Sequence, residues 1–327
     1  MSNLQRGVKL LYLSRADVEA LHCCVSDVLH AVEEAFREKA AGKVEMPPKP
    51  GIHTRANSFI HAMPAFLRGS DVAGVKWVSG YPENSRFGLP YITGLFILNC
   101  AETGVPISVM DCTWMTEKRT AAATALAVRR LAVNAQKLAI IGAGIQGRAN
   151  TEALRAVLPS LSCVSVYDPK AEAVEQFREI FQTNGFDVEQ ALSVKDATSD
   201  ADVIVTCAPI VQHPNPLIES SWMKPGSVGV SLDFDAMFRA ETAHAADRMW
   251  VDDSDQFEYY RQHAGHFVGM PTSYCELMDL VAETAGRKNS AERHIVINLG
   301  LALEDVGTAN MLYRRALDLG VGTVLPS

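Results

Sequence analysis

Residues 137–147 read KLAIIGAGIQG, an apolar run that turns at glycine into a helical segment. A strand, a glycine-rich turn and a helix in this order are the context in which G-x-G-x-x-G binds the pyrophosphate of a dinucleotide. The first glycine makes the tight turn, the second lets backbone N–H groups approach the phosphates, and the third lets the helix pack on the strand. The expected cofactor contacts are Gly142, Ala143, Gly144, Ile145, Gln146 and Gly147.

An acidic residue downstream supports this interpretation. Asp168 ends the next apolar run, VSVYD, about 20 residues beyond the glycines, where a carboxylate accepts a hydrogen bond from a ribose 2′-hydroxyl. Its charge would repel a 2′-phosphate, so we expect NAD rather than NADP. The alternative is a tight strand-to-helix turn that binds no ligand.

From Lys137 onward, apolar runs alternate with helical stretches. The runs are KLAII, VSVYD, DVIVTCAP, SVGVSLDF, MWVDD and HIVINLG. Strands that are apolar almost throughout are typical of a parallel sheet covered on both faces. We therefore predict an α/β fold with a Rossmann-type doubly wound NAD-binding domain over residues 121–304.

The first part of the chain has a different pattern. Residues 14–41 show the apolar spacing of one helix or of two. Residues 43–110 mix short apolar runs with Pro and Gly turns, which is typical of a mostly antiparallel sheet, and the alanine-rich residues 116–132 predict a helix. We expect the helical tail to return to this part, so that residues 1–120 with 305–327 form an α+β domain.

Composition and charge exclude several classes of protein. Of the 327 residues, 48% are hydrophobic and 21% charged, as in ordinary globular proteins. The net charge of −8 argues against a nucleic-acid or anionic membrane surface, which would need clustered Lys and Arg. No apolar run is long enough for a membrane span or a signal sequence, so we expect a cytoplasmic protein that acts on a small molecule.

The seven cysteines show no C-x-x-C spacing, and no histidines are paired at ligand spacing. We therefore expect neither a disulfide framework nor a metal site. Cys163 and Cys207 lie in predicted strands, where a small buried apolar residue is the expected role.

Three cationic residues of the first part stand in unusual settings. Lys49 lies among prolines in EMPPKPG, Lys76 lies inside the apolar strand AGVKWVSG, and Arg119 lies at the start of the alanine-rich helix. A lysine among apolar strand residues needs a partner when it is buried. Cations near a nicotinamide would suit a substrate carboxylate, whereas the alternative for each is a solvated or structural charge.

Several motifs together resemble the ornithine cyclodeaminase/mu-crystallin family, and within it the alanine dehydrogenases and imine reductases. The resemblance covers nearly the whole chain and includes motifs outside the nucleotide fold. The motifs are MPPK at 46–49, HAMP at 61–64, GVKWVSGYPEN at 74–84, GLP at 88–90, ILNCAETGVPISVMD at 97–111, KRTAAAT at 118–124, GAGIQG at 142–147 and GLALED at 300–305.

The resemblance implies a homodimer whose first domain supplies the dimer contacts and the substrate ligands. By position, Lys76 and Arg119 match the residues that hold the substrate α-carboxylate, and Lys49 matches a residue that contacts substrate and is catalytic. We count Lys76 among the catalytic residues as well. Arg119 and Thr120 are also expected to contact the cofactor.

The resemblance also implies a catalytic aspartate in SVGVSLDFDAMFRAE. Asp235 matches the family position better, and Asp233 is the alternative. This segment lacks the family's usual glycine-rich pattern. In the reductive direction an imine nitrogen needs a proton, for which Lys49, or Asp235 through a water, is a plausible donor.

These residues predict an NAD(H)-dependent oxidoreductase that reduces an imino acid, formed from a 2-oxo acid and an amine, or runs the reverse reaction. One alternative is a cyclodeaminase that converts a diamino acid such as ornithine to a cyclic imino acid with release of ammonia. Another is a non-catalytic, crystallin-like protein that binds NAD(P) and a ligand. His61 occupies the position at which cyclodeaminases carry a glutamate for the side-chain amine. A histidine supplies no fixed negative charge, so it argues against a diamino acid and is expected to face the substrate. The alternative for His61 is a core histidine with satisfied hydrogen bonds.

Overall fold

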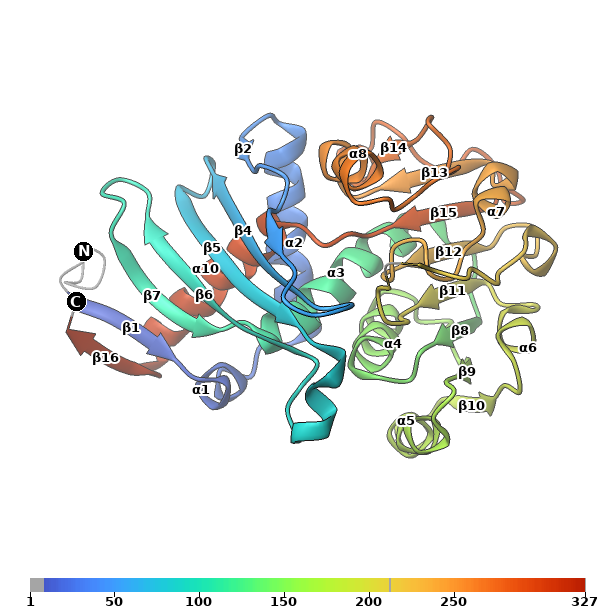
Figure 1. Cartoon of the computed structure of the whole chain (residues 1–327), viewed down its shortest axis with the longest axis horizontal. Coiled ribbons are helices and arrows are strands. Elements are labelled where there is room, and N and C mark those ends of the chain that lie inside the picture. Colours follow the sequence, from blue (N-terminus) through green and yellow to red (C-terminus); the bar gives the residue numbers. More distant parts are fainter. Residues whose placement is uncertain (1–8, 212, 327) are drawn as a thin grey trace. The chain divides into compact units, whose positions relative to one another are not determined.

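The computed structural model describes residues 9–211 and 213–326 (Figure 1). The chain divides into two compact units, which we call the first unit (Met1–Arg119 with Leu301–Ser327) and the second unit (Thr120–Gly300). The divisions follow residues 119 and 300, where the sequence predicted 120 and 304. The first eight residues, with which the predicted first domain begins, lie outside the described residues.

The first unit is an α+β structure built on a mostly antiparallel sheet with the strand order β16-β1-β7-β6-β5-β4-β2, in which β3 also pairs with β4. Its strands are β1 (Lys9–Leu13), β2 (Val44–Glu45), β3 (Gly51–Ile52), β4 (Phe59–Leu67), β5 (Val72–Gly80), β6 (Ile92–Cys100), β7 (Pro106–Asp111) and β16 (Thr323–Pro326). Its helices are α1 (Arg15–Ala20), α2 (Val25–Ala40), the 3-10 helix η2 (Pro82–Phe87), the start of α3 (Thr113–Leu131) and α10 (Ala302–Leu319).

Helix α10 packs against β4, β5 and β6 and against α2. The strands alternate accordingly: Lys76, Val78, Phe96 and Leu98 face the helix and are buried, whereas Trp77 and Leu95 on the opposite face are exposed. Residues 14–41 form two helices, α1 and α2, and Ser14 caps α1 by accepting a hydrogen bond from Asp17 N at 3.2 Å.

The second unit has the predicted doubly wound architecture. All neighbouring strands of its sheet run parallel, in the order β10-β9-β8-β11-β12-β15-β13-β14. The strands are β8 (Lys137–Ile141), β9 (Cys163–Tyr167), β10 (Asp187–Gln190), β11 (Val203–Thr206), β12 (Val228–Ser231), β13 (Arg248–Val251), β14 (Cys275–Glu276) and β15 (His294–Ile297). The helices are the rest of α3, α4 (Ile145–Val157), α5 (Ala171–Thr183), α6 (Val194–Thr198), η3 (Ser220–Trp222), α7 (Ala240–Ala245), α8 (Ser254–His263) and α9 (Leu277–Val281).

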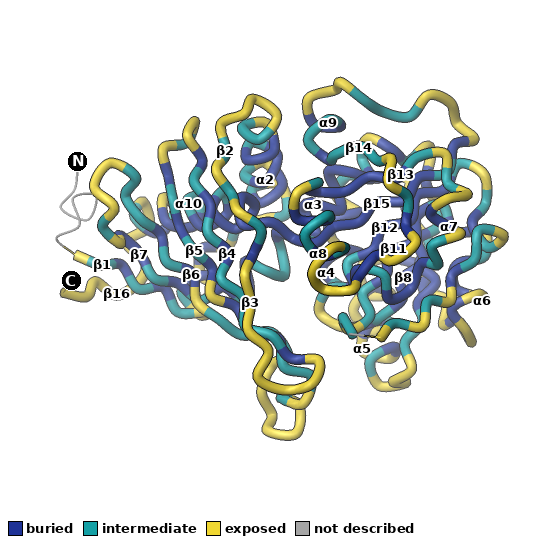
Figure 2. Tube along the Cα trace, turned by 45° about the horizontal axis from the view of Figure 1, so that its top comes forward, coloured by how far each residue is buried: buried dark blue, intermediate teal, exposed yellow. Residues whose placement is uncertain are grey.

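The central strands of this sheet are buried along their whole length, as Figure 2 shows for β11, β12 and β15. The strand order reverses between β8 and β11, and in open α/β sheets ligands bind outside the carboxyl ends of the strands at such a point. Among the helices of residues 9–211 and 213–326, none combines the length and the apolar character that a membrane crossing requires.

Candidate active site

Four charged side chains meet inside the first unit. Lys76 Nζ lies 2.8 Å from Asp305 Oδ1, and Arg119 Nε donates to the same oxygen at 3.0 Å. Arg119 Nη1 donates to Glu304 Oε2 at 2.7 Å. The two cations come from β5 and α3 and the two carboxylates from the first turn of α10, so one helix terminus holds both predicted carboxylate-binding residues.

All four side chains are buried, and we call them the buried ion group. Burial lowers the pKa of Lys76, and the charge of Arg119 acts in the same direction, whereas Asp305 opposes both. Burial also raises the pKa of Glu304, against the pull of Arg119. Its second oxygen, Oε1, is buried and accepts no hydrogen bond from the described residues. The group therefore brings two basic and two acidic side chains together away from water.

His61 and Lys49 lie near this group in the first unit. In the register of β4 and β5, His61 lies opposite Val78, and Met63 lies opposite Lys76. His61 and Lys76 therefore lie on the same side of the sheet, the side that α10 covers. Lys49 is buried, and Ala62 N donates to Pro50 O at 3.0 Å, next to Lys49.

Burial is the main cause that lowers the pKa of His61 to about 3, and the positive charges of Lys49 and Lys76 lower it too. The His61 ring, stacked on Phe59 at 4.4 Å between centroids, is therefore neutral at neutral pH. It can give one hydrogen bond and accept another, but it has no negative charge for an ammonium group.

The glycine turn of the second unit is shaped by two of its three glycines. Gly142 has φ +108°, and a Cβ at Gly147 would lie 2.1 Å from the Gly142 carbonyl oxygen, so both must be glycine for the turn itself. A Cβ at Gly144 would meet no atom within 4 Å, and the φ of Gly144 is an ordinary −74°. The protein alone gives no reason for a glycine at 144, whereas a pyrophosphate that approaches the start of α4 does.

Asp168 lies beside this turn. Its Oδ2 accepts a hydrogen bond from Ala143 N at 2.9 Å, and its Oδ1 accepts one from Lys170 N at 2.8 Å. An ionised carboxylate has about four acceptor positions. Asp168 therefore fixes the glycine turn and keeps capacity for a ribose hydroxyl.

The two candidate aspartates after β12 have different surroundings. Asp233 is buried, and its oxygens accept hydrogen bonds from Thr206 Oγ1 at 2.7 Å, Ser231 Oγ at 2.8 Å and Ala208 N at 2.8 Å. Burial raises its pKa to about 6, although these hydrogen bonds oppose the shift. Asp233 therefore ties the ends of β11 and β12 together.

Asp235 contacts a histidine instead. Its Oδ1 lies 2.8 Å from His266 Nδ1, and its Oδ2 accepts a hydrogen bond from Phe267 N at 2.7 Å. Between the two aspartates, Phe234 has a left-handed backbone with φ +62°, which turns the chain sharply. Its buried ring packs edge-on to His266 at 5.1 Å.

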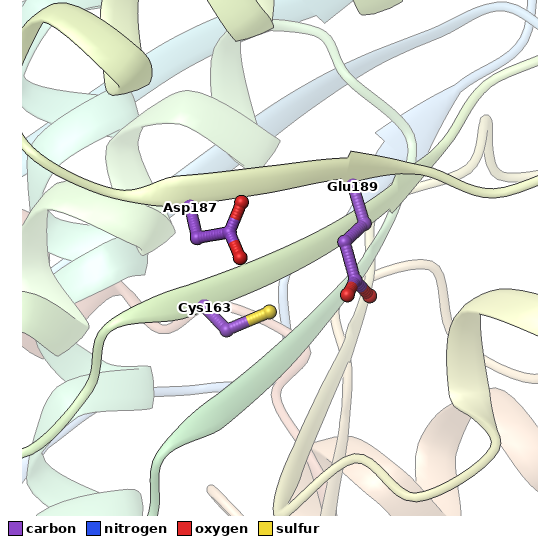
Figure 3. Close-up of side chains that lie close together, drawn as sticks. All are labelled: Cys163, Asp187 and Glu189. Carbon is purple, nitrogen blue, oxygen red and sulfur yellow. The ribbon is translucent and has the colours of Figure 1, made fainter.

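A half-buried cysteine and two exposed carboxylates lie together at the edge of the second sheet (Figure 3). Cys163 is opposite Asp187 in the register of β9 and β10, and Glu189 lies two residues further on. Glu189 Oε2 is already bound to Lys137 Nζ at 2.7 Å, and burial raises the pKa of Cys163, so the metal-binding thiolate form is disfavoured. We expected Cys163 to be buried; only β10 lies beyond β9 in the sheet, and the side chain is partly exposed.

A family model described as "Ornithine cyclodeaminase/mu-crystallin family" matches residues 9–320. The chain belongs to this family. Alanine dehydrogenase of Archaeoglobus fulgidus is 32% identical to it over 336 residues, which cover 97% of this chain and 98% of that relative.

Two solved structures of family relatives also match nearly the whole chain. Δ1-pyrroline-2-carboxylate reductase of Thermococcus litoralis, in complex with NADH and L-proline, is 31% identical, with a TM-score of 0.85 and coverage of 96% of this chain and 99% of that one. An archaeal alanine dehydrogenase dimer with bound NAD is 30% identical, with a TM-score of 0.86 and coverage of 97% and 99%.

In this member of the ornithine cyclodeaminase/mu-crystallin family, sequence reasoning assigned no role to Glu304, Asp305 or His266. Glu304 and Asp305 were visible as adjacent acids at the start of an otherwise apolar helical tail, in the GLALED motif, and buried Lys76 required such a partner. No local signal pointed to His266, because its contact with Asp235 joins segments about 30 residues apart.

Proposed function

We propose that this chain is an NAD(H)-dependent imine reductase or amino acid dehydrogenase that interconverts a 2-imino acid and the amino acid. The buried ion group carries this proposal. Buried ion pairs contribute little net stability compared with apolar packing, so two buried cations on one carboxylate favour a functional role. The family relatives described above support the same class of reaction.

The surroundings of Gly144 fit a bound NAD. The backbone conformation of Gly144 is ordinary, and the space that a Cβ would occupy there is open. The residues that would hold NAD are the turn at 142–147, the amino end of α4 and Asp168, which would accept from the ribose. Arg119 and Thr120 remain proposed cofactor contacts. When bound, NADH supplies the hydride that reduces the imine carbon.

The chain's own residues would bind and orient the substrate. Lys76 and Arg119 would bind the α-carboxylate and so fix the position of Cα, because Asp305 and Glu304 hold both cations in place. Lys49 would contact the substrate close to its carboxylate, and Asp235 would act at the site of proton transfer.

The neutral His61 defines the other end of the substrate. A neutral imidazole beside Lys49 and Lys76 has no attraction for a second ammonium group, whereas it can hydrogen-bond a carbonyl, a hydroxyl or a carboxylate. We therefore propose a monoamino substrate rather than a diamino acid.

We also propose that the protein forms a homodimer through the outer face of the first sheet. Trp77 and Leu95 lie opposite each other in the register of β5 and β6, and they are 50% and 46% exposed. Adjacent large apolar side chains on one sheet face are typical of an interface, and the archaeal relative is a dimer. Light scattering would give the mass of two chains, and a monomer at micromolar concentration would contradict this proposal.

The experiment follows NADH absorbance with 2-oxo acids plus ammonia or methylamine, with cyclic imino acids, and with diamino acids. We expect NADH consumption with an imine and none with ornithine. Gly144→Ala should weaken NADH binding about tenfold or more without loss of folding, since its Cβ meets no protein atom. Gly286→Ala is the control, because its Cβ would also meet no protein atom and its φ lies outside the left-handed range, and it should bind NADH normally. Release of ammonia from a diamino acid at constant NADH would contradict the proposal.

A further inference from the structure

The pair formed by Asp235 and His266 has the arrangement of an oriented acid–base histidine. Asp235 uses one oxygen for His266 Nδ1 and the other for Phe267 N. A carboxylate that accepts from Nδ1–H fixes the tautomer of the ring and directs Nε2 away from it. The described residues make no hydrogen bond to Nε2 that competes with a ligand.

The surroundings keep this ring in one orientation. Phe234 packs against it edge-on at 5.1 Å, and Tyr260 of α8 does so at 6.2 Å. Among the described residues, the titratable groups that face His266 are Asp235, from the segment after β12, and Tyr260, from α8. Burial raises the pKa of Tyr260, so it stays neutral in the working range of a histidine. Asp235 is therefore the charged neighbour that acts on the imidazole.

The pair also belongs to the edge of the sheet where a nucleotide is expected. Asp235 follows β12 by four residues, and the same segment is tied to the end of β11 through Asp233 and Ala208 N. Strand β11 lies next to β8 on the far side of the reversal in strand order. Ligands of doubly wound sheets bind outside the carboxyl ends of such strands.

We propose that His266, held by Asp235, is the catalytic acid that protonates the imine nitrogen, and the base in the reverse direction. This inference rests on the proposed function. The proton leaves Nε2 and the π electron pair of the C=N bond forms the new N–H bond, while the carbon receives the hydride that NADH supplies. The imine is reduced to an amine, NADH is oxidised to NAD⁺, and neutral His266 regains a proton from water.

Asp235 then acts as a positioning residue, in place of the donor through a water that the sequence analysis gave as one of two candidates. The competing interpretation is that the pair merely anchors the segment 232–239 to the loop after α8. The two interpretations differ at Nε2, because an anchor needs the Nδ1 contact alone.

His266→Asn separates them, since the asparagine amide can still donate to Asp235 but has no group in place of Nε2. We expect kcat for imine reduction to fall about 100-fold or more, with KM and NADH affinity little changed. His263→Asn is the matched control, because His263 is exposed at the end of α8, and it should keep wild-type kcat.

Nitrogen-15 NMR of the imidazoles provides a second readout that needs neither turnover nor the variant. In wild-type protein the neutral His266 ring should carry its proton on Nδ1 rather than on Nε2, because Nδ1 faces Asp235 Oδ1, and Asp235→Asn should abolish this preference. Wild-type kcat in a folded His266→Asn, or a neutral His266 protonated on Nε2, would overturn the inference and leave the proposed function intact. If wild-type protein reduces no imine, the proposed function fails and this inference fails with it.

Discussion

The two units bury carboxylates in opposite ways. In the first unit, Asp305 and Glu304 are each within 3.0 Å of a buried cation. In the second unit, Asp233 is equally buried, but its partners are two hydroxyls and one backbone N–H. The first arrangement keeps charges that must compensate each other, and the second ties two strands together through one carboxylate.

This difference has energetic consequences. A buried charge that loses its counter-ion keeps the full cost of desolvation, whereas a carboxyl group held by neutral donors can take up a proton instead. Asp233 is such a carboxyl group, because burial raises its pKa to about 6 and so favours its protonated form. The first unit should therefore tolerate the loss of one partner much less well than the second.

The largest effect is expected from Lys76→Met. Asp305 would remain buried with Arg119 as its one cation, so the free energy of unfolding should fall by roughly 3–5 kcal/mol, and turnover should be lost. Urea unfolding followed by circular dichroism measures the first quantity. The double variant Lys76→Met with Asp305→Leu should recover part of the stability, because Arg119 keeps Glu304. Equal stability of Lys76→Met and wild type would show that the ions of the first unit are not interdependent.

A smaller effect, with a defined pH dependence, is expected from Asp233→Asn. Folded protein binds a proton at Asp233 with a pKa of about 6, against 3.8 when unfolded. The folded state thus binds more protons between these values, and its stability falls by about 3 kcal/mol as pH rises through the window. Asparagine does not titrate, so this part of the fall should disappear. The cost at neutral pH should be about 1–2 kcal/mol, since Ala208 N loses its acceptor.

Asp200→Asn is the control for this experiment, because Asp200 is exposed and its left-handed backbone suits asparagine. Urea unfolding at a series of pH values should show the wild-type slope in this control. The same slope in Asp233→Asn would mean that another group titrates in the window, and the contrast between the units would then be lost.

The sequence predicted the fold well where the pattern was local. The apolar runs from KLAII onward gave the parallel strands directly, and the glycines with Asp168 marked the turn that the structure places between β8 and α4. Cys163 was misjudged because its exposure depends on the place of β9 near the edge of the sheet, which no strand pattern reveals.

The candidate site was harder to predict because its contacts join distant segments. Lys76 and Arg119 stood out as isolated cations, but their partners lie about 185 residues or more away in α10. The sequence favoured Asp235 over Asp233 by family position alone. Their different surroundings arise from the left-handed turn at Phe234 and from contacts with Thr206 and His266.

The most direct test of the proposed imine reduction uses NADH that carries deuterium at both C4 positions of the nicotinamide. The protein is incubated with labelled NADH and the imino acid that it consumes fastest, and the amino acid product is examined by mass spectrometry and NMR. The account predicts one deuterium at Cα of the product for each NADH oxidised. An unlabelled product, or ammonia released from a diamino acid with no loss of NADH, would contradict it.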